Sequence, residues 1–366
     1  MVRHNAENER IKHRYFQYLC EAKRYSSQTV DGVAQSLTRF ERHSKFQSFK
    51  KFHRQKAIAF KTYLAMERNQ STGKPLSKST RLSTLNALKA FFFWLADQPG
   101  YRSLMNYSDS EYFNMSEKDT RAAKTHTSRS IPTMEQIRTV LDIMPNDSDC
   151  QKRDRALVAF TILTGSRDGA TITLKLKHID AVNRKVTFDG REVSTKFSKS
   201  FTTWFFPVGD DIEKIVTDWL TYLKQTLLFG PEDPLFPTTK IVSTQSVGFQ
   251  VDGLSRDHWL TASPIREVFK KAFESAALPY ANPHSFRNTL TQIGEQLCCT
   301  PEEFKAWSQN IGHEKIMTTL TSYGAVQPNR QAEIIMSLNA RPRQDNSDTI
   351  SLSEIENLIR NRMMRV

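Results

Sequence analysis

The 366-residue sequence lacks any apolar run long enough to span a membrane. Its two longest runs, Ala156–Leu163 and Ala90–Ala96, fall well short of the roughly 20 residues that a spanning helix needs. The polar start carries no secretory signal. Cysteines are few and none has CxxC spacing, which is typical of a reducing compartment and disfavours a zinc site. The four are Cys20, Cys150, Cys298 and Cys299. We expect a cytoplasmic protein without a membrane partner.

Acidic residues are scarce in the first third of the chain. Residues 1–130 hold 24 Lys and Arg against 11 Asp and Glu, whereas the remaining 236 residues hold 28 of each kind. The whole net charge of +13 therefore lies in the first third. Such an asymmetry is expected of a module that binds a polyanion, so double-stranded DNA is the predicted partner. The alternative is an ordinary helical domain with a solvated basic face.

Residues 1–105 have the pattern of a basic helical domain. Apolar residues recur at helical spacing from Ser79 to Leu95, and a second helix is expected over Phe52–Arg68. Both helices carry cations between their apolar positions, which predicts contacts with a DNA backbone. The candidate DNA-binding residues are Lys51, Arg54, Lys56, Lys61, Lys78, Arg81 and Lys89.

The rest of the chain predicts a linker, a second domain and a tail. Residues 106–131 have no apolar periodicity and are expected to be a linker. Residues 132–340 open with Thr133 as a helix cap completed by Gln136, continue through a buried helix ended by Gly165, and contain β-rich runs up to position 208. Helices are expected from 212 to 338. The predicted fold class is mainly α with a small antiparallel sheet.

Residues 341–366 have the pattern of a polar spacer followed by a short amphipathic helix. Ser351 and Glu354 form a capping box, and the apolar residues beyond them share one face. These apolar residues are Ile355, Leu358, Ile359 and Met363. The helix is expected to pack either on its own domain or on a neighbouring copy.

Five short motifs in the second domain, each weak alone, contain the candidate catalytic residues. They are Thr-Gly-Ser-Arg, a hairpin lysine, His-Ser-Phe-Arg, Gly-His and Thr-Ser-Tyr-Gly, which contribute Arg167, Lys196, His284, Arg287, His313 and Tyr323. Paired arginines can neutralise the oxygens of a phosphate through bidentate hydrogen bonds. The set has no carboxylate or Cys/His cluster that would hold a metal, so we expect no metal and no cofactor.

In order and spacing these motifs resemble the catalytic domain of the tyrosine recombinases, the phage-type integrases, over residues 133–325. The resemblance implies that Tyr323 attacks the scissile phosphate and forms a 3′-phosphotyrosyl link. It implies that His284 handles the tyrosine proton and that His313 binds the phosphoryl oxygens. It also implies that Lys196 protonates the leaving 5′-oxygen, with Lys199 as the alternative.

One position departs from the family pattern. An acidic residue usually follows the first arginine by three positions, but this chain has Ala170 there. The expected function is site-specific DNA recombination or integration. The first 130 residues and the tail favour a mobile element over a chromosome. A homotetramer on specific sites and an accessory DNA-bending protein are the expected partners. A type IB topoisomerase-like enzyme and a non-catalytic DNA-binding regulator are the alternatives.

Overall fold

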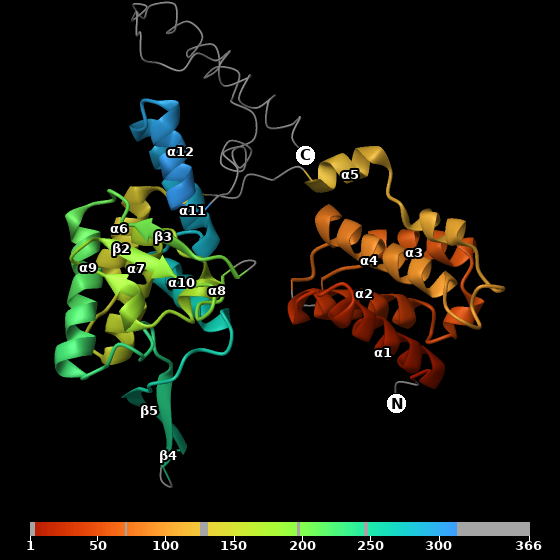
Figure 1. The fold of residues 1–366 in the computed structure, drawn as a ribbon, viewed down its shortest axis with the longest axis horizontal. Coiled ribbons are helices and arrows are strands. Elements are labelled where there is room, and N and C mark those ends of the chain that lie inside the picture. Colours follow the sequence, from red (N-terminus) through yellow and green to blue (C-terminus); the bar gives the residue numbers. More distant parts are fainter. Residues whose placement is uncertain (1–3, 70–71, 125–130, 196–197, 245–247, 313–366) are drawn as a thin grey trace, which may run out of the picture. The chain divides into compact units, whose positions relative to one another are not determined.

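The computed structural model describes residues 4–69, 72–124, 131–195, 198–244 and 248–312, which divide into two compact units, 1–127 and 128–366. The fold is mainly helical with small antiparallel sheets, as predicted (Figure 1). Among the described residues no helix is long and apolar enough to cross a membrane. Each unit has its own hydrophobic core.

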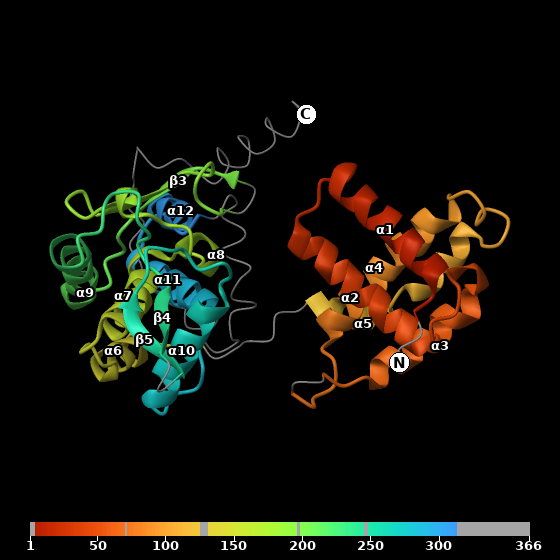
Figure 2. The same ribbon diagram turned by 90° about the horizontal axis from the view of Figure 1, so that it is seen from below.

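Five helices and two 3₁₀ turns make up the described part of the first unit (Figure 2). All of these elements except the last helix contribute to an aromatic core. Phe52 and Phe92 stack with ring centroids 3.7 Å apart, and Phe113 stacks on Phe52 at 5.6 Å. The elements are α1 (Ala6–Glu21), α2 (Ser27–His43), η1 (Phe49–Lys51), α3 (Arg54–Met66), α4 (Lys78–Ala96), η2 (Tyr107–Phe113) and α5 (Glu117–Lys124). The two predicted helices correspond to α3 and α4.

The expected linker, residues 106–131, is only partly a connection. Its first half forms η2, and Phe113 is almost fully buried in the core of the first unit. Its second half includes α5, which contacts α4. Aromatic packing from distant helices orders this segment, although its own sequence has no apolar periodicity.

The second unit is built around α7, whose last nine residues are all buried. A three-stranded sheet in the order β1–β2–β3 is antiparallel throughout, with Phe188 opposite Phe201 at the loop end of the β2–β3 hairpin. The elements up to this hairpin are α6 (Met134–Ile143), α7 (Asp149–Thr164), α8 (Asp168–Thr171), η3 (Leu176–His178), β1 (Ile179–Asp180), β2 (Lys185–Phe188) and β3 (Phe201–Trp204). The predicted capping box of Thr133 and Gln136 is confirmed at the start of α6.

The remaining elements include strands where helices were expected. A second hairpin, β4–β5, projects from the unit in Figure 1, and its paired residues Ile241 and Val251 are both exposed. Helices dominate the described part of 212–338, as predicted, but the sequence did not indicate this hairpin. The elements are α9 (Asp210–Thr221), η5 (Tyr222–Thr226), β4 (Thr239–Thr244), β5 (Gly248–Leu254), α10 (Ser263–Ser275), α11 (Pro283–Leu297) and α12 (Pro301–Asn310).

Candidate active site

The turn after α7 presents Arg167 beside the start of α11. Gly165 caps α7 with φ +64°, a left-handed conformation that favours glycine. A Cβ at Gly165 would lie 3.1 Å from Cδ1 of Leu290 and 3.9 Å from Nη1 of Arg287, so glycine also allows α11 to approach this turn. Arg167 then opens α8, and its carbonyl accepts the amide of Ala170 at 2.9 Å.

Arg287 is held on the buried side of α11. The helix begins with Asn282 as its cap and Pro283 in its first turn. Only 3% of Arg287 is exposed, and its Nη1 donates to the carbonyl of Gly165. Its Nε and Nη2 are buried and have no hydrogen-bond partner among the described residues. Two guanidinium donors are therefore left for a group that is not part of the described protein.

The electrostatics of the two arginines favour an anion. Burial, together with the positive charge of Arg167, lowers the pKa of Arg287 to about 9. Burial also lowers the pKa of Arg167. A buried cation without a carboxylate partner is unfavourable, and a phosphate would supply both the opposite charge and the missing acceptors.

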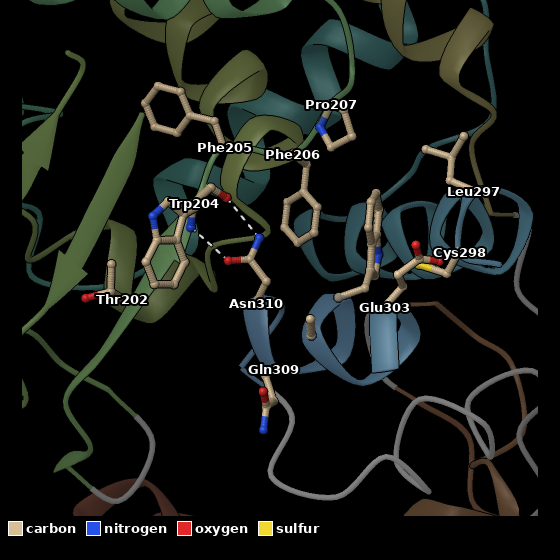
Figure 3. Close-up of a pocket in the computed structure, with 12 residues that line it drawn as sticks. Thr202, Trp204, Phe205, Phe206, Pro207, Leu297, Cys298, Glu303, Gln309 and Asn310 are labelled. Carbon is tan, nitrogen blue, oxygen red and sulfur yellow. Dashed lines mark hydrogen bonds between the residues drawn. The ribbon is translucent and has the colours of Figure 1, made fainter. Parts of the chain in front are cut away.

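The end of α12 lies next to Arg167. A Cβ built on Gly312 would be 3.9 Å from Nη1 of Arg167. Asn310 holds this end against β3, because its Nδ2 donates to the carbonyl of Trp204 at 2.9 Å and its Oδ1 accepts the amide of Trp204 at 2.8 Å (Figure 3). The chain is thus fixed two residues before Gly312, and His313 is the next residue after it.

The other candidate residues are placed less completely. His284 lies one helical turn before Arg287, and its side chain is exposed where that of Arg287 is buried. Lys196, His313 and Tyr323 lie outside the described residues, as does the C-terminal helix expected from 351 to 363. The structure therefore brings Arg167 and Arg287 together, and the roles of all six residues remain predictions.

Sequence reasoning missed the partner of Asp168. Both Nε and Nη2 of Arg266 donate to this carboxylate, at 2.9 and 2.8 Å. The neighbouring Ala170 is buried. Arg266 is 98 residues away in the sequence, and no local motif indicates the contact. Among the described residues no group of three or more His, Cys, Asp or Glu side chains is arranged to hold a metal.

A cavity of about 570 Å³ lies between β3 and α12, beside the Asn310 contact (Figure 3). Aromatic rings form much of its wall, and Phe206 packs against Trp307 with centroids 4.8 Å apart. Trp307 is fixed by the hydrogen bond from its Nε1 to the carbonyl of Leu290, at 2.8 Å. The cavity is therefore lined by Trp307 and Asn310, the two residues whose hydrogen bonds hold α12 near the arginines.

The seven candidate DNA-binding residues of the first unit differ in whether their side chains already bind other groups of the protein. Three bind groups of the segment 107–119: Lys61 donates to the carbonyl of Asn114, Lys89 pairs with Glu111 at 2.8 Å, and Lys78 pairs with Asp119 at 2.9 Å. Lys56 donates to Gln47, and Nε of Arg81 is buried. Lys51 and Arg54 are exposed on consecutive elements, η1 and α3.

Comparisons with known proteins agree with this geometry. Residues 132–330 match the phage integrase family. The chain is 22% identical over 253 residues to tyrosine recombinase XerC of Lactobacillus leichmannii, covering 68% of this chain and 73% of that protein. Its fold is similar to that of a lambda integrase dimer bound to a COC′ core site, with a TM-score of 0.58, 14% identity and coverage of 94% and 80% of the two chains. Tn1549 transposon integrase in complex with a circular intermediate DNA also has a TM-score of 0.58, with 15% identity and coverage of 90% and 99%.

Proposed function

The chain belongs to the phage integrase family, and we propose that it is a site-specific DNA recombinase that cuts and rejoins strands through a phosphotyrosyl intermediate. The observation that carries this proposal is the arginine pair, in which the buried Arg287 keeps two donors without a described partner. The basic first unit supports double-stranded DNA as the substrate. Proteins of similar fold have been solved bound to DNA.

In this mechanism the phenol oxygen of Tyr323 attacks phosphorus as the bond to the 5′-oxygen breaks. His284 takes the phenol proton, since a free tyrosine has a pKa of about 10 and needs a base at neutral pH. Lys196 gives a proton to the departing 5′-oxygen. One phosphodiester replaces another, so the 5′-hydroxyl of a second strand can reverse the step without a nucleotide cofactor.

Arg167 and Arg287 hold the non-bridging oxygens during this exchange. Negative charge gathers on these oxygens in the transition state, and the burial of Arg287 keeps water from weakening its contact. His313, the residue after Gly312, is proposed as a third donor. Guanidinium groups can thus supply the charge neutralisation that phosphoryl transfer requires.

The proposed assembly and partners follow from the requirements of recombination. Exchange of two duplexes requires four active sites, so a homotetramer on paired specific sites is the proposed assembly, with an accessory DNA-bending protein as a further partner. We propose that the enzyme acts in the cytoplasm and is encoded by a mobile genetic element. The basic first unit and the extension after position 340 are what favour the mobile element.

The proposal is tested by covalent trapping in EDTA. Wild type and Tyr323→Phe are incubated with a pool of nicked duplexes, denatured and run on an SDS gel. An adduct with wild type alone supports the proposal, and sequencing the trapped DNA gives the site. Salt-sensitive binding by both proteins without an adduct would favour the non-catalytic regulator. Adducts on DNA of every sequence would favour a topoisomerase-like activity.

A further inference from the structure

The loop between β2 and β3 is closed at its base. Gly190 lies against the backbone of Ser198 so tightly that a Cβ would fall 2.0 Å from the Ser198 carbonyl oxygen. The amide of Gly190 donates to Oγ of Ser200 at 3.0 Å, and Oγ1 of Thr195 donates to the carbonyl of Lys199 at 2.7 Å. Thr195 is the last described residue before Lys196. The two ends of the loop are therefore bonded to each other, and contacts from other elements can fix the loop as a whole.

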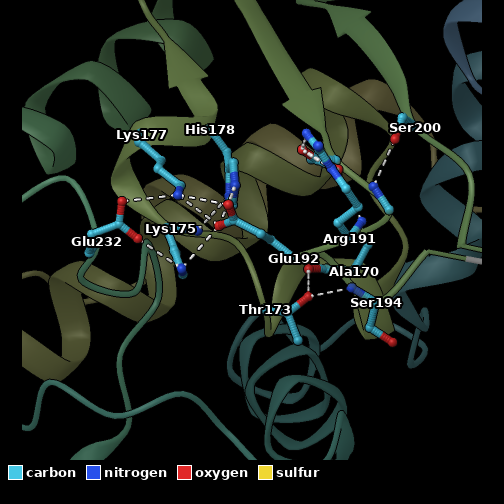
Figure 4. Close-up of polar contacts among 12 residues, drawn as sticks. Ala170, Thr173, Lys175, Lys177, His178, Arg191, Glu192, Ser194, Ser200 and Glu232 are labelled. Atoms are coloured by element: carbon cyan, nitrogen blue, oxygen red, sulfur yellow. Dashed lines mark hydrogen bonds and ion pairs between the residues drawn. The ribbon is translucent and has the colours of Figure 1, made fainter.

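A short chain of hydrogen bonds joins this loop to the turn of Arg167 (Figure 4). The carbonyl of Arg167 accepts the amide of Ala170, and the carbonyl of Ala170 accepts Oγ1 of Thr173 at 3.0 Å. The same Thr173 oxygen accepts the amide of Ser194 at 2.8 Å. One hydroxyl group thus connects the arginine turn to the loop, two residues before Lys196.

A second attachment lies at Glu192. Its carboxylate binds Lys175 at 3.0 Å and Lys177 at 2.8 Å, and Glu232 binds the same two lysines at 2.9 Å each (Figure 4). Nε2 of His178 is 3.6 Å from the Glu192 carboxylate and is buried. These lysines follow Thr173 by two and four residues, so both attachments hold the loop to one segment.

The Glu192 attachment remains charged at working pH. Hydrogen bonds from Lys177 and Lys175 lower the pKa of Glu192 to about 2. Val193, between the two attached residues Glu192 and Ser194, is only 2% exposed and adds an apolar contact. Three consecutive loop residues are therefore held, through the carboxylate of Glu192, the buried side chain of Val193 and the backbone amide of Ser194.

We propose that Thr173 and Glu192 are positioning residues, which fix the β2–β3 loop against the Arg167 turn so that Lys196 meets the leaving 5′-oxygen. This inference rests on the proposed function, in which Lys196 is the proton donor. A general acid must come within hydrogen-bond reach of its target, and a displacement of about 1 Å can reduce a rate about 100-fold. A surface ion-pair cluster would by itself add little to stability, which makes a positional role the better account of it.

The test separates proton donation from every other step by changing the leaving atom. Two duplexes carry the site recovered by trapping, one with the natural 5′-oxygen at the scissile phosphate and one with a bridging 5′-sulfur. A thiolate leaves without a proton, because thiols are far more acidic than alcohols. The readout is the single-turnover rate of adduct formation at saturating full-length enzyme.

The variants are Thr173→Val, which keeps the side-chain shape, and Glu192→Gln. On the oxygen duplex we expect both to be slower than wild type by about 10- to 100-fold. On the sulfur duplex we expect the wild-type rate. Equal slowing on both duplexes, or no slowing on either, would overturn the inference.

Matched controls remove the same groups elsewhere in the unit. Thr217→Val removes a hydroxyl bonded to the Glu213 carbonyl on α9, and Asp218→Asn removes a carboxylate paired with Lys214 at 2.8 Å. Both are expected to react like wild type on both duplexes. Slowing of either on the oxygen duplex alone would contradict a positioning role specific to Thr173 and Glu192.

Three reference variants separate this inference from the proposed function. Lys196→Ala should be slow on the oxygen duplex and restored by sulfur. If Lys199→Ala shows this behaviour instead, Lys199 is the proton donor and the inference about Lys196 fails. If sulfur does not restore Lys196→Ala, its role as the proton donor and the inference both fail, while attack by Tyr323 stands. If Tyr323→Phe still forms the adduct, the proposed nucleophile fails.

Discussion

At the residue scale, Arg287 shows how a binding group can oppose folding. It is buried next to another cation, and Nη1 alone has a described acceptor. Replacing Arg287 would remove its hydrogen bond to Gly165, which would lower the free energy of unfolding by about 1 kcal/mol. Replacing a buried charge by an apolar residue of similar volume is often neutral or stabilising by about 1–4 kcal/mol. The guanidinium is therefore better explained by phosphate binding than by stability.

We expect Arg287→Met to melt at a higher temperature than wild type at neutral pH and to cleave DNA about 10²- to 10³-fold more slowly. The pKa of Arg287 is about 9 in the fold, below its unfolded value near 12.5. Between these values the unfolded chain binds more protons, so wild-type stability from this group rises with pH. The advantage of the variant should then shrink above about pH 9. Melting curves of both proteins across pH would show this, and a variant less stable at neutral pH would refute it.

At the scale of elements, local signals predicted those features that local chemistry determines. The Thr133 cap of α6 and the Gly165 end of α7 are both confirmed. The β4–β5 hairpin was missed because its strands pair with each other and leave apolar residues such as Ile241 exposed, so no alternation marks a buried face. The contact of Asn310 with Trp204 was missed because 106 residues separate them.

That contact gives the prediction at this scale. Asn310→Ala removes both side-chain bonds to Trp204, and at about 1 kcal/mol each the loss is about 2 kcal/mol. Because the contact holds the chain just before Gly312, cleavage should fall more than stability alone explains. Gln309→Ala, on the exposed neighbouring position, is the control and should change neither quantity. Denaturant unfolding and single-turnover cleavage measure the two effects; an Asn310→Ala protein that cleaves at the wild-type rate would rule out this role.

At the scale of the whole molecule, composition predicted a DNA partner but not which cations would be available to it. The excess positive charge of residues 1–130 can be counted from the sequence. The pairing of Lys89 with Glu111 and of Lys78 with Asp119 depends on the fold of a segment that was expected to be a linker. The convergence of Arg167 and Arg287 was expected from the family resemblance, since spacing alone does not bring residues 120 positions apart together. The roles of all six candidate catalytic residues stay predictions.

Because Lys78 and Lys89 are already paired with carboxylates, we expect them to contribute less to DNA binding than the exposed Lys51 and Arg54. Each phosphate contact adds about −0.9 to the slope of log K against log salt. Lys51 and Arg54 are exposed on η1 and at the start of α3, so Lys51→Gln with Arg54→Gln should flatten the slope of the full chain by about 2. Lys89→Gln should flatten it by less than about 1, because its ammonium already binds Glu111 and Asn114. Fluorescence anisotropy with a labelled duplex over a salt series measures all three proteins. A wild-type affinity that does not change with salt, or a larger effect of Lys89→Gln than of the double change, would contradict the assignment of the exposed pair to the DNA backbone.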